Sequence, residues 1–199
     1  MIIASQKKKE NIAEYLLYMW QIEDIIRAYG LDIDQIQKHI INSYDLPEEQ
    51  KKSMREWYES LIDMLHSEGV EKKGHLQLNK NVLIDLTDLH LRLLKSTREP
   101  FYGAAFFKTL PYIVELRAKS GEGKTGELET CFNALYGVLL LRLQKKEIQS
   151  DTLKAIQQIS TFLSILAEKY KQEKAGELDR KSTRLNSSHP SRSRMPSSA

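Results

Sequence analysis

The sequence predicts an all-α protein that folds as a single-domain antiparallel bundle of about seven helices. Apolar residues recur at helical spacing along most of the chain. Only nine glycines and five prolines occur, and most lie between the periodic segments, which argues against a sheet protein rich in turns. We expect helices over residues 5–29, 32–44, 45–65, 78–95, 100–119, 127–146 and 150–173, joined by short connections.

The first expected helix begins with Ser5 as its cap and ends before Gly30, which suits the position just after a helix. Its segment Tyr15–Trp20 is apolar on all sides, so either the core or a partner must cover it. The second and third expected helices carry apolar stripes with the period of one helix face. These stripes comprise Ile33, Ile36, Ile40 and Ile41, and then Met54, Trp57, Leu61, Met64 and Leu65.

Two of the later segments contain residues that bear on whether the segment is a regular helix. In residues 78–95, Leu89, Leu91 and Leu93 alternate, so a strand is the competing interpretation, but the length of the segment favours a helix. Pro111 lies inside the helix expected over residues 100–119. It predicts a kink, because proline removes a backbone donor and clashes with the preceding turn.

The helical domain is expected to cover residues 1–176, followed by a disordered tail over residues 177–199. Residues 180–199 contain seven serines, five basic residues and no acidic residue, a composition that offers little apolar area for a core. The run STRLNSSH is typical of translated adaptor or vector sequence, so we interpret the tail as non-native.

The basic character of the whole chain comes from this tail. Without the five basic residues of 180–199, 25 of the 30 basic residues remain against 27 acidic ones, a net charge of −2. The sequence pI of 8.8 is therefore no argument for a nucleic-acid partner, and we expect none.

Cellular location follows from the apolar runs and the cysteine content. No apolar stretch approaches the roughly 20 residues that a membrane-spanning helix needs, so we expect no membrane association. Cys131 is the only cysteine, which excludes an internal disulfide and favours a reducing compartment, the cytoplasm.

Cys131 lies near the start of the helix expected over residues 127–146, where the helix dipole could lower its pKa. A buried structural thiol is the simpler expectation.

Three runs of sequence resemble a known bacterial family. They are KKENIAEYLLYMWQIEDIIRAYGLDID near the N-terminus, LPYIVELRAKS, and LYGVLLLRLQKKEI. All three resemble a bacterial family of small helical proteins that is classified only as a domain of unknown function. The resemblance covers most of residues 1–175 and implies a stand-alone bacterial cytosolic protein. It implies no catalytic residue, cofactor or partner.

The stretch AKSGEGKT, residues 118–125, has a loose phosphate-loop pattern in which Ala118 replaces the first glycine. In a true phosphate loop, backbone N–H groups hold the phosphates between a strand and a helix. Gly126 follows where the helix should already run, and no later apolar run ends in an aspartate for Mg²⁺. We therefore interpret the stretch as a solvated connection, with nucleotide binding as an alternative.

The histidines do not predict a metal site. Their spacing contains neither HxxxH nor HExxH, and Cys131 has no second cysteine beside it. We therefore expect no metal and no cofactor. The histidines concerned are His39, His66, His75, His90 and, in the tail, His189.

Charged residues directly after the apolar segment of the first helix predict a polar pocket between helices. Glu23 and Arg27 have the i,i+4 spacing of an ion pair, and Asp24 lies between them. If this part of the helix is buried, these charges must be paired or line a cavity. Glu14 and Gln21 are further candidates for the same pocket. A helix-surface salt bridge is the alternative interpretation.

These observations favour a non-enzymatic cytosolic protein that acts through protein–protein interaction, including association with a second copy of itself. The reason is surplus apolar surface on the helices expected over 5–29 and 150–173, together with the absence of a chemical motif. One alternative is a small-ligand binder or enzyme with an interhelical pocket near the first helix. Another is a phosphate-loop nucleotide binder.

Overall fold

A computed structural model describes residues 2–120 and 125–176, and the predicted tail over 177–199 lies outside the described residues. The described part contains helices and no strand, which confirms the all-α, single-domain fold. The segment 78–95, where a strand was the competing interpretation, is helical. The helices are α1 (Ile2–Glu10), α2 (Ile12–Ala28), α3 (Ile33–His39), a short 3₁₀ helix η1 (Ile41–Ser43), α4 (Glu48–Ser67), α5 (Gln77–Lys95), α6 (Pro100–Ser120), α7 (Glu127–Leu143) and α8 (Ser150–Lys174).

The helix expected over residues 5–29 is divided at Asn11 into α1 and α2. Asn11 has an extended backbone, and its side chain accepts hydrogen bonds from the N–H groups of Ala13 at 3.0 Å and Glu14 at 3.2 Å. Asparagine is one of the strongest N-cap residues, so it ends one helix and starts the next. Ser5 lies inside α1 and does not cap a helix, contrary to the sequence prediction.

The helix expected over residues 32–44 is also shorter in the structure. Asp32 caps α3 through its side chain, which accepts from the N–H groups of Asp34 and Gln35. α3 then ends at His39 and is followed by η1. Gly30 lies between α2 and α3 with a φ of +65°, as predicted for the residue after a helix, because glycine adopts this conformation without strain.

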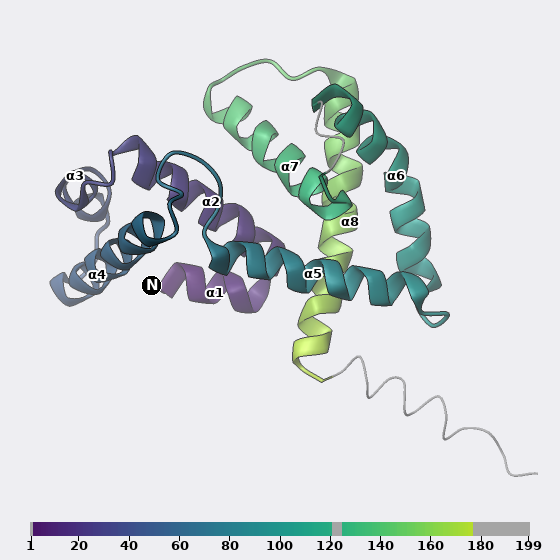
Figure 1. Ribbon diagram of the computed structural model, residues 1–199, viewed down its shortest axis with the longest axis horizontal. Helices are drawn as coiled ribbons and strands as arrows, with labels where there is room; N and C mark the ends of the chain where they lie inside the picture. The colour runs from purple at the N-terminus through teal and green to yellow at the C-terminus, as the bar shows by residue number, and fades with distance from the viewer. Residues whose placement is uncertain (1, 121–124, 177–199) are drawn as a thin grey trace, which may run out of the picture.

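The helices are not all aligned with one another. In Figure 1, α6 and α8 pack side by side and run in opposite directions, whereas α5 crosses α8. α2 packs against α1, α4, α5 and α8, so it lies at the centre of the arrangement. α6 continues as one helix through Pro111. The kink at Pro111 and the antiparallel order of the whole bundle stay predictions.

The core covers the apolar segment of α2. Tyr15, Leu16, Met19 and Trp20 are each at most 6% exposed. They belong to one hydrophobic cluster that takes side chains from α1 through α8. The core therefore covers four residues of Tyr15–Trp20, and the half-buried Leu17 and Tyr18 pack against the same cluster.

A buried histidine lies in the aromatic part of this core, where α5, α6 and α8 meet. His90 is 1% exposed, and the rings of Tyr102, Phe106 and Phe162 surround it with centroids 4.7 to 5.8 Å away. Burial lowers the pKa of His90, and the carboxylate of Glu127 acts more weakly in the opposite direction. A neutral imidazole is therefore the stable form in the folded protein near neutral pH.

Replacing His90 by Gln is expected to reduce the loss of stability on acidification. Because the pKa of His90 is lower in the folded chain, the unfolded chain takes up the proton first as the pH falls below about 6.5. The free energy of unfolding then decreases until the pH reaches the lower folded-state pKa. Urea denaturation of both proteins between about pH 7 and pH 5 measures the difference. If the free energy of unfolding fell equally in the variant and the wild type, a group other than His90 would cause the acid sensitivity.

Candidate functional site

Glu23 is a fully buried carboxylate that joins α2 to the start of α5. Its side chain has no exposed area. Oε1 accepts hydrogen bonds from the backbone N–H of Leu76 at 2.9 Å and from Nδ2 of Asn79 at 2.7 Å. No side chain of α5 itself caps this helix. Glu23 therefore accepts from the backbone N–H of Leu76, the N-cap residue of α5, and from a side chain in the first turn of the helix, where the helix dipole also favours negative charge.

The second oxygen of Glu23 holds His75. Nδ1 of His75 lies 2.6 Å from Oε2 of Glu23, and the imidazole stacks on Trp20 with centroids 4.1 Å apart and an interplanar angle of 11°. A carboxylate can only accept, so Nδ1 carries the hydrogen and donates it. The carboxylate of Glu23 and the ring of Trp20 together hold His75 in position. The hydrogen bond to Glu23 also determines that Nδ1 carries a hydrogen.

Arg27 and Asp24 extend the network to the loop between α4 and α5 and to α7. Arg27 donates to Oδ1 of Asp24 at 2.9 Å and to the carbonyl oxygens of Val70, at 3.1 Å, and Gly74. Asp24 also accepts a hydrogen bond from the hydroxyl of Tyr136. Burial, followed by the neighbouring Asp24, raises the pKa of Tyr136, so this hydroxyl keeps its proton. The network thus fastens the loop to α2.

The structure brings together three of the five predicted pocket residues. Glu23, Asp24 and Arg27 belong to one network, but none of them lines the pocket beside it, so their place in a pocket stays a prediction. Glu14 lies elsewhere: its side chain is 60% exposed and pairs with Lys7 at 3.2 Å. Gln21 is half-buried and shares none of the hydrogen bonds that the structure describes around Glu23.

A pocket of about 440 Å³ opens beside this network, on the side of Trp20 and His75. His75 is the residue that links the two, since its side chain is 31% exposed while the Glu23 side chain behind it is fully buried. We call this cavity the Trp20–His75 pocket. It is lined by Trp20, His75, Leu116, Thr130, Asn133, Ala134, Tyr136 and Gly137.

Two ring nitrogens of the lining side chains have no partner within residues 2–120 and 125–176. Nε1 of Trp20 is buried without a hydrogen bond, although Trp20 is only 3% exposed. Nε2 of His75 receives no hydrogen bond either, and in the neutral tautomer with its hydrogen on Nδ1 this nitrogen presents a lone pair. One donor and one acceptor are therefore available to a bound molecule.

Gly137 lies on the wall of the pocket in the middle of α7. A glycine inside a helix costs roughly 0.5–1 kcal/mol relative to alanine. No atom lies within 4 Å of the position that a Cβ would take, so packing does not require a glycine here. A larger side chain could therefore be placed at this position of the pocket wall without a clash at its Cβ atom.

The phosphate-loop alternative gains no support from the described residues. Residues 121–124 of the phosphate-loop stretch lie outside the described residues. Tyr112–Leu116, which would have to be the preceding strand, is part of α6. Within the described residues, no group of three or more His, Cys, Asp or Glu side chains could hold a metal ion. None of the helices described is both long and apolar enough to cross a membrane.

Cys131 is a buried thiol, and the suggestion that the dipole of α7 lowers its pKa is wrong. Its side chain has no exposed area, and burial raises the pKa of Cys131 to about 12, with a smaller contribution from Glu127. Removing a thiolate from water costs more than the dipole returns at this depth.

We expect Cys131 to react with iodoacetamide only through unfolding. The thiolate is the nucleophile, and both the raised pKa and the burial withhold it in the folded chain. Mass spectrometry at about pH 8 should show slow alkylation of the native protein and rapid alkylation in urea. Equal rates in the two conditions would contradict the buried placement of Cys131.

The fold and the site define a small all-α protein with a buried charged network and, beside it, a pocket between its helices. The chain belongs to the family described as a domain of unknown function, DUF4924, whose match covers residues 1–177. The resemblance drawn from the three sequence runs is therefore confirmed at the level of an uncharacterised family. No curated protein and no solved structure matches the chain.

Proposed function

We propose that the protein binds a small hydroxyl-bearing molecule in the Trp20–His75 pocket. The observation that carries the proposal is the state of His75, whose Nδ1 is held by buried Glu23 while Nε2 is left without a partner in the described part of the chain. A hydroxyl group donates to such a nitrogen and can also accept from the indole N–H of Trp20. Leu116 and Ala134 supply apolar wall for the body of the ligand.

The same geometry suits proton transfer. A carboxylate that orients an imidazole through Nδ1 leaves Nε2 free to take a proton from a bound hydroxyl. The positive charge that then forms on His75 is stabilised by Glu23 at 2.6 Å. Acid–base chemistry on the bound hydroxyl is thus the reaction that the pocket could support.

Phenol and toluene form a matched pair of probes, because they differ chiefly in the hydroxyl group. We expect phenol to shift the NMR signals of Trp20 and Gly137 in a saturable way, with toluene weaker. Loss of one neutral hydrogen bond corresponds to a difference of about two- to tenfold in Kd. Equal affinity for both probes, or no saturable shift with phenol, would exclude the proposal.

Gly137→Leu tests the position of binding without attacking the buried network. Its side chain would enter the open space beside the pocket, and leucine favours a helix more than glycine does. We expect this variant to fold and to lose the phenol-induced shifts. Gly103→Leu is a matched control, because Gly103 also lies in a helix with open space around its Cβ position and does not line the pocket. This control should bind phenol as the wild type does.

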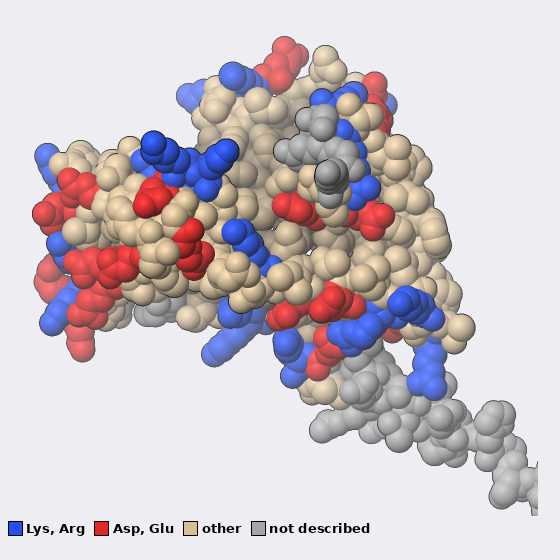
Figure 2. Space-filling model, viewed as in Figure 1, with Lys and Arg blue, Asp and Glu red and all other residues tan. Residues whose placement is uncertain are grey.

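Self-association is the second candidate function, and the outer face of α6 favours it. The surplus apolar surface predicted on the helices over 5–29 and 150–173 is largely buried in α2 and α8. On α6, by contrast, Phe107 is 66% and Val114 is 56% exposed. Figure 2 shows few charged side chains along the right-hand edge of the molecule, where α6 lies in Figure 1. The exposed α6 stripe consists of Phe107, Pro111, Val114 and Ala118.

Charge complementarity indicates a second copy of the chain as the occupant of the α6 stripe. Lys108 and Glu115 are exposed, lie two turns apart and flank the same edge of the stripe. In a two-fold antiparallel pair of α6 helices, Lys108 of each copy faces Glu115 of the other. The apolar side chains of the two stripes then meet between these charges.

Sedimentation velocity at high protein concentration tests the dimer. We expect Lys108→Glu to weaken it through like-charge repulsion, and Lys108→Glu combined with Glu115→Lys to restore it. Lys38→Glu on α3 makes the same charge change away from the stripe and should leave the dimer unchanged. A monomeric wild type, or a charge-swapped pair that fails to recover, would rule out this arrangement.

A cytoplasmic location is proposed alongside these functions. Its support is the lone cysteine, Cys131, which is buried as a thiol and has no second cysteine with which to pair. Fractionation of cells that express the full chain with a terminal epitope tag measures the location. Recovery of the protein in the membrane or secreted fraction would contradict it.

A further inference from the structure

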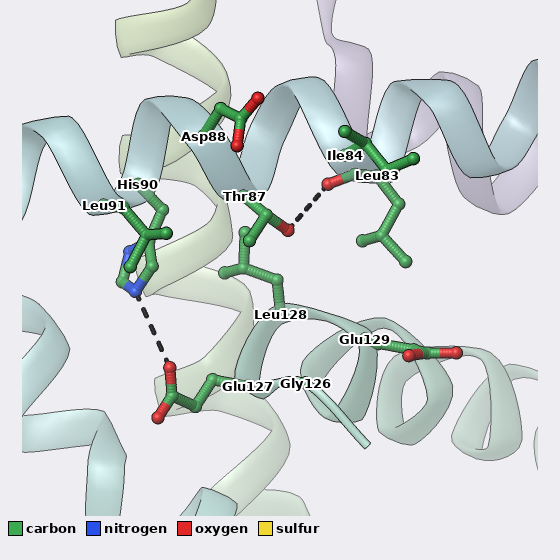
Figure 3. Close-up of a pocket in the computed structure, with 10 residues that line it drawn as sticks. All are labelled: Leu83, Ile84, Thr87, Asp88, His90, Leu91, Gly126, Glu127, Leu128 and Glu129. Atoms are coloured by element: carbon green, nitrogen blue, oxygen red, sulfur yellow. Dashed lines mark hydrogen bonds and ion pairs between the residues drawn. The ribbon is translucent and has the colours of Figure 1, made fainter. Parts of the chain in front are cut away.

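A second pocket lies where α5 meets the start of α7, and it contains an unpartnered nitrogen of His90. The imidazole is 1% exposed, and its Nε2 has no hydrogen-bond partner within residues 2–120 and 125–176. Oε2 of Glu127 is 4.0 Å from this nitrogen, as the dashed line in Figure 3 marks, which is too far for a hydrogen bond. Buried polar atoms rarely remain unpaired, so a bound group is expected between the two side chains.

Tyr102 determines which nitrogen of His90 carries the hydrogen. The hydroxyl of Tyr102 lies 2.6 Å from Nδ1 of His90. This nitrogen is the one hydrogen-bond partner of the hydroxyl in the described part of the chain. Burial raises the pKa of Tyr102 and lowers the pKa of His90, so the phenol is protonated and the imidazole neutral near neutral pH. Because the hydrogen of the Tyr102 hydroxyl has no acceptor other than Nδ1 among the described residues, it is donated to Nδ1 of the neutral ring. Nε2 then carries the hydrogen and is a donor toward the pocket.

The remaining walls define what the pocket can accept. Its volume is about 250 Å³, and Leu83, Leu91 and Leu128 contribute apolar surface. The N-cap residue of α7 is Gly126, which has no side chain that could accept from the first N–H groups of this helix. Figure 3 shows His90 and Thr87 on α5 beside Glu127 and Leu128 at the start of α7. The pocket is lined by Leu83, Ile84, Thr87, Asp88, His90, Leu91, Gly126, Glu127, Leu128 and Glu129.

We propose that this second pocket binds a small neutral molecule with a primary amide or hydroxyl group on a short aliphatic chain. The oxygen of the ligand accepts from Nε2 of His90, and its N–H or O–H donates to Glu127. One polar group can reach both, because the two side-chain atoms are 4.0 Å apart. The carboxylates of Asp88, Glu127 and Glu129 disfavour an anion, and the Nε2 donor gives no hydrogen bond to an ammonium group.

Three probes with the same four-carbon chain separate these chemistries: butyramide, butyrate and butylamine. The full chain with labelled histidine reports through the Nε2–H signal of His90, and the methyl signals of Leu83 and Leu128 report the apolar wall. We expect a saturable shift of all three signals with butyramide and none at Nε2 with the other two probes. An unmoved Nε2 signal with butyramide, or binding of butyrate at equal strength, would overturn the proposal.

Two substitutions sharpen this experiment. His90→Phe keeps an aromatic ring in the core and removes Nε2, so the affinity for butyramide should fall about two- to tenfold. Glu127→Gln, at a side chain that is 38% exposed, should keep the fold and raise the affinity for butyrate relative to the wild type. Glu56→Gln removes the same charge from an exposed position on α4 outside the pocket and should not change butyrate binding. If Glu127→Gln and Glu56→Gln behaved alike, Glu127 would not be the acceptor.

Discussion

Replacing Glu23 by Ala is expected to lower the free energy of unfolding by about 3–5 kcal/mol, the range for breaking a buried charged pair. The substitution removes the acceptor for the backbone N–H of Leu76, for Nδ2 of Asn79 and for Nδ1 of His75. It also leaves Arg27, 4.0 Å from Oε2, with less compensating charge. Urea denaturation followed by circular dichroism measures the change.

Two further variants separate the charge of Glu23 from the helix position. Glu23→Gln keeps an oxygen for Leu76 and Asn79, so it should cost less than Glu23→Ala. Glu14→Ala removes an exposed carboxylate from the same helix and should change stability by less than about 1 kcal/mol. Should Glu23→Ala cost no more than Glu14→Ala, Glu23 does not hold the loop and α5 in the way described.

Replacing Phe162 by Ala should cost about 3–5 kcal/mol, the range for deleting a buried aromatic ring. Phe162 on α8 has no exposed area. Its ring lies 5.6 Å from the rings of Tyr102 and Phe106 and 5.8 Å from His90, measured between centroids. The substitution therefore opens a cavity between three helices that the rigid rings around it cannot fill.

Phe101 provides the matched control for Phe162. It carries the same side chain on α6 but is 88% exposed, so Phe101→Ala should change the free energy of unfolding by about 0.5 kcal/mol or less. Phe162→Leu leaves a smaller cavity and should fall between the two variants. Similar costs for Phe162→Ala and Phe101→Ala would mean that α8 is not packed on α5 and α6 as described.

Most of the fold could be predicted because the helices are amphipathic over long segments. The expected helix over 78–95 is α5, Gln77–Lys95, and the one over 150–173 is α8, Ser150–Lys174. Both predictions depend on a periodic apolar face, which can be read from the sequence whichever helices pack against it. The break at Asn11 was missed because α1 and α2 follow each other without glycine or proline, and a single capping side chain separates them.

The network was predictable in part, because burial of Tyr15–Trp20 carries the next turn of the helix into the core. Glu23 and Arg27 lie four residues apart and share a face, so both enter the network. Glu14 lies nine residues before Glu23. That is two and a half turns, which places Glu14 on the opposite face. Helical periodicity could therefore have excluded Glu14 at the start.

The partners of this network could not be derived from local patterns. His75 is 52 residues from Glu23, and Tyr136 is 112 residues from Asp24. No motif links positions at such separations, because the approach of α7 and of the loop before α5 to α2 depends on the packing of the whole chain. The spacing of the histidines gave no sign of His75 as a pocket residue.

The central claim is that His75 is held by Glu23 on one side and offers Nε2 to a ligand on the other. A long-range ¹H–¹⁵N NMR spectrum of the histidine side chains, recorded with and without phenol, measures both nitrogens directly. We predict that Nδ1 of His75 carries the hydrogen in the free protein, and that phenol shifts Nε2 far more than Nδ1. A hydrogen on Nε2 in the free protein, or an Nε2 signal that phenol does not move, would contradict the claim.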